Sequence, residues 1–183
     1  FDILENRPRF IKPYKREYRD LPIADAVLAS SSVPGYFPPV AGRFVDGGVG
    51  SYANPCYLAA YEARFCLNWD PQETTLLSLG TGRAPDSIRA GQPERFHAWD
   101  WLLPMLDAFL LSANDQQVHL VETFFEGLDF RRFQVNLSER IAMDDPAAIP
   151  KLVRYGAQMA EKIMNDETDQ AMGVEPERIA VSV

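Results

Sequence analysis

The stretch GRFVDGGVG at residues 42–50 decides how this chain is interpreted, because it delivers one carboxylate into a glycine-rich turn. A short apolar run predicts a strand over residues 43–45 that ends at Asp46. Loops at the ends of strands are where a rigid scaffold presents catalytic groups. Gly47 and Gly48 remove side-chain obstruction and let a ligand or another backbone approach closely. Asp46 is therefore a candidate catalytic carboxylate; the alternative is a turn aspartate that bonds its own backbone.

Three further motifs accompany this turn in a consistent order: ADAVLASSSVPGYFPPV at 24–40, SYANP at 51–55 and LSLGTG at 77–82. Together with D-G-G, they resemble the patatin-like phospholipases, lipid acyl hydrolases that use a serine–aspartate dyad. The resemblance covers about residues 21–83, and it rests on the combination, since each motif alone is weak. In that family the aspartate of D-G-G/A is the catalytic base, a role that the resemblance assigns to Asp46.

The chain departs from the family in one respect, because the nucleophile motif G-x-S-x-G is absent. No serine of the chain has glycine at both −2 and +2, and the family's glycine-rich oxyanion loop is also missing. We therefore expect the C-terminal portion of a longer enzyme, inactive by itself, whose serine lies in a missing N-terminal part. The resemblance further implies an α/β fold, the C-terminal part of a three-layer α/β/α sandwich with a mainly parallel sheet.

The substrate that the resemblance implies is a lipid ester, either a phospholipid or an acylglycerol. The alternative function is a non-enzymatic module that binds lipid or protein and has lost the nucleophile. The G-T-G of residues 80–82 could instead suggest phosphate binding after a strand. It lacks the G-x-x-x-x-G-K-[ST] pattern, so a tight turn at the end of the strand is favoured.

Composition narrows the partners of the chain. Its 183 residues, 46% hydrophobic, suit one domain with a core, here a fragment of a larger one. The net charge of −8 argues against nucleic acid as a partner, so none is expected, and it also disfavours broad attraction to anionic lipid. The exception is residues 7–19, which hold six Lys and Arg residues. They are interpreted as a solvated surface, or else as a contact with lipid headgroups or with the missing part.

Cysteine and histidine usage predicts no metal and no cofactor. Cys56 and Cys66, on one helix, would lie about 15 Å apart and could not pair, which suits a reducing compartment. His97 and His119 have no metal-ligand spacing. The sequence has no run of 18 apolar residues, so no transmembrane helix is expected. A cytoplasmic protein in peripheral contact with membranes is the expectation.

Three regions are expected along the chain: a basic extended segment at 1–20, a motif-bearing core at 21–83 and a mainly helical part at 98–183. Alternating strands and helices suggest the parallel α/β arrangement. The expected elements are a helix from Pro22 to Ser31, a helix from Asn54-Pro55 to about Leu67, a buried strand at 74–79, a helical stretch at 98–126 broken near Pro104, a partly strand-like segment at 130–137, a helix from about Asp145 to Asn165, and a short strand or frayed end at 179–183.

The Trp- and Leu-rich stretch at 99–111 is ambiguous. Its side chains suit a membrane interface, but its two aspartates and its lack of Lys and Arg fit anionic membranes poorly. A core or subunit-contact helix is favoured there.

Overall fold

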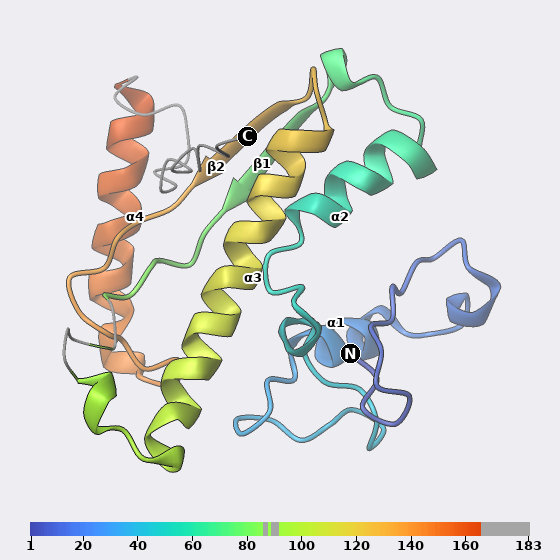
Figure 1. The fold of residues 1–183 in the computed structure, drawn as a ribbon. Helices are drawn as coiled ribbons and strands as arrows, with labels where there is room; N and C mark the ends of the chain where they lie inside the picture. The colour runs from blue at the N-terminus through green and yellow to red at the C-terminus, as the bar shows by residue number, and fades with distance from the viewer. Residues whose placement is uncertain (86–87, 89–91, 166–183) are drawn as a thin grey trace, which may run out of the picture. The chain divides into compact units, whose positions relative to one another are not determined.

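The computed structural model describes residues 1–85, 88 and 92–165 (Figure 1). The chain divides into two compact units. The first unit joins Phe1–Leu58 with Leu102–Leu120, and the second joins Ala59–Trp101 with the chain from Val121 onward. Helices combine with a small parallel sheet, which is compatible with the predicted α/β class.

Helix α1, Ile23–Ser31, confirms the first predicted helix. Pro22 occupies the N-cap position directly before it, where its missing N–H removes no helical hydrogen bond. The helix buries only Ala29. Its larger apolar side chains point outward, with Ile23 83% and Val27 57% exposed.

The strand predicted over residues 43–45 is wrong as a regular strand. Phe44 instead makes isolated antiparallel bridges, one with Asp2 and one with Val40. Ala41 and Gly42 have φ values of 52° and 62°, so a tight turn directly precedes this segment and limits its pairing. A 3-10 turn, η2 at Gly47–Gly50, follows it. In the 1–20 segment, one 3-10 turn, η1, spans Arg16–Tyr18.

Helix α2, Cys56–Tyr61, continues as a π-helical turn, η3, over Glu62–Cys66 and ends at the cap residue Leu67, as predicted. Cys56 is buried and Cys66 is exposed, and neither forms a disulfide. The 3-10 turn η4, Pro71–Glu73, then leads into the sheet.

Strands β1, Thr75–Leu79, and β2, Asp129–Phe133, pair in parallel with Thr75 opposite Asp129. They confirm both predicted strand regions. The expectation that the first strand is buried is wrong, because Leu77 is 56% and Leu79 is 68% exposed. The described residues form a sheet of two strands, and a pair of strands cannot cover its own faces.

The long helix α3, Leu102–Phe124, follows two 3-10 turns, η5 at Pro93–Arg95 and η6 at Ala98–Trp101. It is not broken at Pro104. Proline is tolerated there because the first turn of a helix has no intrahelical use for its N–H groups.

The final predicted helix is confirmed as the 3-10 turn η7, Pro146–Ala148, and helix α4, Ile149–Met164. The expected strand or frayed end at 179–183 lies outside the described residues. Within the described ranges, no helix combines the length and the apolar character needed to cross a bilayer.

Candidate functional site

Asp46 lies where the short bridged segment meets the 3-10 turn. Val45, directly before it, is 3% exposed, so the backbone enters the turn from a buried position. The N–H of Asp46 donates to the carbonyl of Ser32 at 3.0 Å, and Ser32 is the residue that caps the C-terminus of α1. The end of α1 therefore holds the backbone that carries the candidate carboxylate.

The carboxylate of Asp46 uses one oxygen and leaves the other open. Its Oδ1 accepts a hydrogen bond of 2.6 Å from the N–H of Gly48 and so caps the 3-10 turn. Its Oδ2 has no hydrogen-bond partner among the described residues. The turn aspartate and the available base are thus compatible interpretations of the same half-buried side chain.

The two glycines after Asp46 differ in the space around them, a difference that no sequence pattern signals. A Cβ on Gly48 would lie 2.9 Å from Oδ1 of Asp46 and 3.4 Å from the Cβ of Ala53. A Cβ on Gly47 would meet Tyr52 at an ordinary 3.8 Å. The position of the carboxylate therefore depends on the missing side chain at Gly48 and not on that at Gly47.

The serines that precede the site are engaged elsewhere. The hydroxyls of Ser30 and Ser31 donate to the carbonyl of Val27, and that of Ser32 donates to the carbonyl of Leu28 at 2.6 Å. In the described part of the chain, no serine hydroxyl bonds the carboxylate of Asp46.

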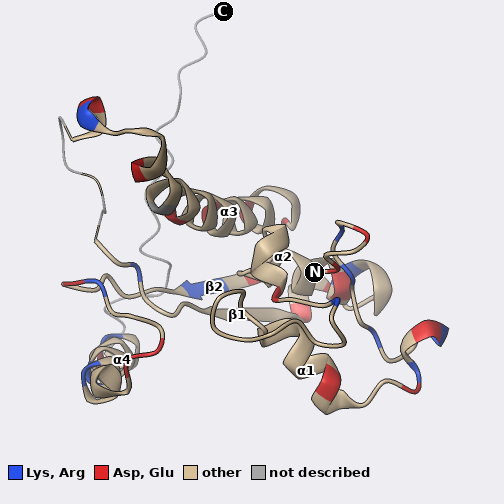
Figure 2. Cartoon of the chain, turned by 90° about the horizontal axis from the view of Figure 1, so that it is seen from below, with Lys and Arg blue, Asp and Glu red and all other residues tan. Residues whose placement is uncertain are grey.

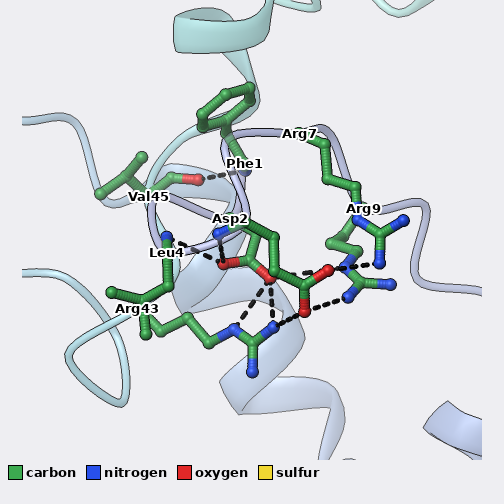
Figure 3. A network of polar contacts seen from close by, with 8 residues as sticks. Phe1, Asp2, Leu4, Arg7, Arg9, Arg43 and Val45 are labelled. Atoms are coloured by element: carbon green, nitrogen blue, oxygen red, sulfur yellow. Dashed lines mark hydrogen bonds and ion pairs between the residues drawn. The ribbon is translucent and has the colours of Figure 1, made fainter.

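A second carboxylate, which sequence reasoning missed, anchors the segment before Asp46 (Figure 3). Asp2 is completely buried. Its Oδ2 accepts hydrogen bonds from Nε and Nη2 of Arg43 at 2.8 and 2.6 Å. Its Oδ1 accepts from the backbone N–H groups of Leu4 and Glu5 at 3.1 and 3.2 Å. The hydrogen bonds from Arg43 hold the pKa of Asp2 well below its usual range, against the opposing effect of burial.

Glu5 extends this network, and it accounts for part of the basic segment. Its carboxylate forms ion pairs with Arg7, Arg9 and Arg43. Because Arg43 lies three residues before Asp46, the network fixes the approach of the chain to the candidate site. No local pattern signals it, since Asp2 and Arg43 are 41 positions apart.

Two buried amide side chains hold the far end of the same loop. Gln117, on α3, donates from Nε2 to the carbonyl of Ser51 at 3.4 Å. Asn54 accepts at Oδ1 from the N–H of Cys56 at 3.2 Å, which fits its predicted role at the start of α2. The remaining atoms of these amides, Nδ2 of Asn54 and Oε1 of Gln117, are buried without a hydrogen-bond partner in the described structure.

The G-T-G turn after β1 is filled by protein side chains. The N–H of Gly82 donates to Oε1 of Gln134 at 3.3 Å, and a Cβ on Gly80 would overlap the Gln134 side chain. The geometry thus favours the strand-end turn over a phosphate cradle. The side chain of His97 is almost fully exposed, and its Nδ1 lies 3.5 Å from Oδ2 of Asp100. No group of three metal-ligating side chains occurs in the ranges that the structure describes.

Comparison with known families places the site in context. Residues 2–60, about a third of the chain, match the family model described as patatin-like phospholipase. The matched range contains Asp2, α1 and the Asp46 loop, and it stops short of the LSLGTG motif that contributed to the resemblance. No curated protein matches the chain. The match supports a relation of residues 2–60 to the patatin-like family, and it suggests a lipid acyl hydrolase.

Proposed function

We propose that this chain supplies the general base of a patatin-like acyl hydrolase that cleaves phospholipid or acylglycerol esters, and that Asp46 is that base. One observation carries the proposal most directly. Within the family-matched range, Asp46 keeps Oδ2 open while Gly48 fixes Oδ1 at 2.6 Å. A carboxylate held by one oxygen has a defined direction for the other.

The chemistry needs a serine from outside these 183 residues. A hydroxyl is a weak nucleophile until a base takes its proton. In the proposed reaction, this serine attacks the acyl carbonyl, Asp46 accepts the serine proton, and the proton then passes to the leaving alcohol. Water next attacks the acyl-enzyme, with Asp46 again accepting a proton. General-base assistance of this kind contributes roughly 10²–10⁴ in rate.

Gly47 and Gly48 shape the loop in this proposal and perform no chemistry. Gly48 contributes its N–H and leaves the space in which the Asp46 carboxylate sits. Gly47 begins the 3-10 turn, which directs the N–H of Gly48 toward the Asp46 carboxylate.

Each unit exposes apolar side chains, which supports the proposal that a further segment covers them. Leu77 and Leu79 project from a sheet of only two described strands. Further strands and covering helices would complete the three-layer α/β/α sandwich that the family implies. Within the first unit, α1 exposes Ile23 and Val27, and its C-cap residue Ser32 holds the backbone of Asp46. A serine-bearing N-terminal part that reaches Asp46 would lie beside this helix.

Peripheral contact with a membrane, in a cytoplasmic protein, completes the proposal. Figure 2 shows that α1 is almost uncharged, while charged residues of both signs lie in the chain before it. Arg7 and Arg9 are ion-paired, whereas the described structure gives Lys15, Arg16 and Arg19 no salt bridge. These three side chains are the basic groups of the segment that are available to lipid headgroups.

The test separates the chain from its parent protein. The purified 183-residue chain is expected not to accelerate hydrolysis of a p-nitrophenyl ester. In the longer parent protein, a fluorophosphonate probe is expected to label a serine outside this chain, mapped by peptide mass spectrometry. Labelling of a serine within the chain would overturn the proposal. So would hydrolysis by the isolated chain at a rate that Asp46→Ala leaves unchanged.

A non-enzymatic lipid- or protein-binding module is the second candidate. The absence of G-x-S-x-G from the chain favours it, as does the use of Asp46 Oδ1 as a turn cap. The coding sequence upstream of Phe1 discriminates the two functions. A G-x-S-x-G motif there supports the enzyme, and a start codon near Phe1 supports the module.

A further inference from the structure

Gln117 is an unexpected buried group near the candidate base. It lies on α3 within the first unit, 66 residues from the loop that it contacts, and is only 6% exposed. Glutamine is usually a surface residue, and an amide is costly to bury unless it is hydrogen-bonded. Its neighbour Gln116 on the same helix is exposed.

The orientation of the Gln117 amide is fixed by its contact. Nε2 donates to the carbonyl of Ser51, and a flipped amide would place two oxygens against each other. Oε1 is then left buried without a partner. An unpaired buried polar atom costs about 1–3 kcal/mol. An apolar side chain of the same volume would avoid this cost. The benefit of an amide at this position must therefore come from the hydrogen bond of Nε2 to the carbonyl of Ser51.

The paired half holds the end of the Asp46 turn. Ser51 caps the 3-10 turn in the left-handed region, with φ 71°, a strained conformation for a residue other than glycine. Its N–H donates back to the carbonyl of Gly48 at 3.1 Å. Gly48 in turn donates to Oδ1 of Asp46. Gln117, Ser51, Gly48 and Asp46 thus form a continuous chain of hydrogen bonds and covalent links.

Asn54 shows the same half-paired state on the other side of Ser51. It is 3% exposed, and its Oδ1 holds the N–H of Cys56 while its Nδ2 has no partner in the described structure. Two buried amides therefore secure the chain after Asp46. Each carries one unpaired polar atom, and the free-energy cost of burying that atom is offset by the loop geometry that the paired atom stabilises.

We infer that Gln117 is a positioning residue for Asp46, which acts through the carbonyl of Ser51 and never touches the substrate. The inference rests on the proposed function, since positioning has meaning only when Asp46 is the base. A misplacement of about 1 Å at a reacting group can lower the rate by about 10²-fold. Loss of this single long hydrogen bond, several bonds from the carboxylate, is expected to cost roughly tenfold.

The deciding variant is Gln117→Met in the serine-containing parent protein, because methionine keeps the volume and removes both amide atoms. The kcat per titrated serine, counted with a fluorophosphonate, is expected to fall roughly tenfold with KM unchanged. The melting temperature is expected to change little, because removal of the unpaired Oε1 offsets loss of the hydrogen bond to Ser51. A purely structural glutamine would lose stability and active fraction while keeping kcat per titrated serine.

Gln116→Met is the matched control, with the same substitution one position away on the exposed face of α3. It is expected to change neither kcat nor melting temperature. The inference is overturned if Gln117→Met and Gln116→Met have equal kcat values while Asp46→Asn lowers kcat by roughly 10²-fold or more. If Asp46→Asn itself leaves turnover intact, the proposed function fails instead, so the two failures are distinguishable.

Discussion

Asp2 and Asp46 lie in the same unit, on neighbouring paired segments, and their carboxylates are used in opposite ways. Asp2 is fully buried, and both of its oxygens are occupied by Arg43 and backbone N–H groups. Asp46 is half-buried and has one oxygen bonded to Gly48. A saturated carboxylate has nothing left to offer a substrate, whereas a half-saturated one is both oriented and available. The two aspartates thus differ in both burial and hydrogen-bond partners, and Asp46 is the one whose carboxylate keeps an oxygen for the proposed chemistry.

The largest effect is expected for Asp46→Asn in the serine-containing parent protein. The amide oxygen can still accept from Gly48, but the side chain can no longer take a proton, so kcat should fall by roughly 10²–10⁴. Ester hydrolysis measures this, with the melting temperature as the check on folding. Asp25→Asn, on the exposed side of α1, is the control and should retain full activity. Equal activities of the two variants would place Asp46 with the structural aspartates.

The next effect compares the two glycines. Gly48→Ala places a Cβ 2.9 Å from Oδ1 of Asp46, so the carboxylate must move and kcat should fall by about 10–100-fold. Gly47→Ala meets only ordinary contacts and should stay within about twofold of the unmodified protein. Steady-state kinetics on both variants checks this. An equal loss in both would show that the turn itself, and not the space beside Asp46, limits activity.

Asp2→Asn should act on stability and spare the chemistry. The variant leaves the Arg43 guanidinium without its buried anionic partner, so the melting temperature should fall by about 5 °C. The kcat per titrated serine should be unchanged, because both oxygens of Asp2 are occupied by Arg43 and by backbone N–H groups. Thermal unfolding followed by circular dichroism gives the first value. Asp20→Asn, exposed in the same region, should leave the melting temperature where it was.

The smallest effect is the pH dependence of that stability difference. Arg43 depresses the pKa of folded Asp2 below the unfolded value of about 3.9. The stabilisation is therefore complete above about pH 4 and is lost as the pH falls toward the folded pKa. Urea unfolding between pH 7 and pH 2.5 should give a difference in the free energy of unfolding between the unmodified chain and Asp2→Asn. This difference should decrease only below pH 4. If the difference in the free energy of unfolding stays constant across this pH range, the ionisation of Asp2 is not its source.

The elements that the sequence predicted well are those with chemical signals at their ends. Pro22 precedes α1, Asn54-Pro55 precedes α2, and Asp145-Pro146 precedes α4, where Asp145 caps the turn through Ala147. Such caps act over two or three residues, so they can be read locally.

The elements that it missed depend on distant partners or on backbone angles. The expected strand at 43–45 is curtailed by the positive φ values of Ala41 and Gly42, which no apolar pattern reports. The Asp2–Arg43 pair and the Gln117–Ser51 contact join residues 41 and 66 positions apart. The glycine turn singled out Asp46 as a candidate, and its catalytic role stays a prediction. The oxygen without a hydrogen-bond partner and the unequal surroundings of Gly47 and Gly48 depend on the direction of one side chain.

The π-helical end of α2 gives the protein two thiols of unequal access. Cys66 is exposed at the end of this turn, whereas Cys56 is buried at the start of the helix, immediately after the loop that begins at Asp46. A maleimide should therefore modify Cys66 quickly, and Cys56 only when the beginning of α2 opens. The rate of this slow second addition, measured by intact-protein mass spectrometry, would report how often the chain opens locally beside the candidate base. The measurement needs no engineered label.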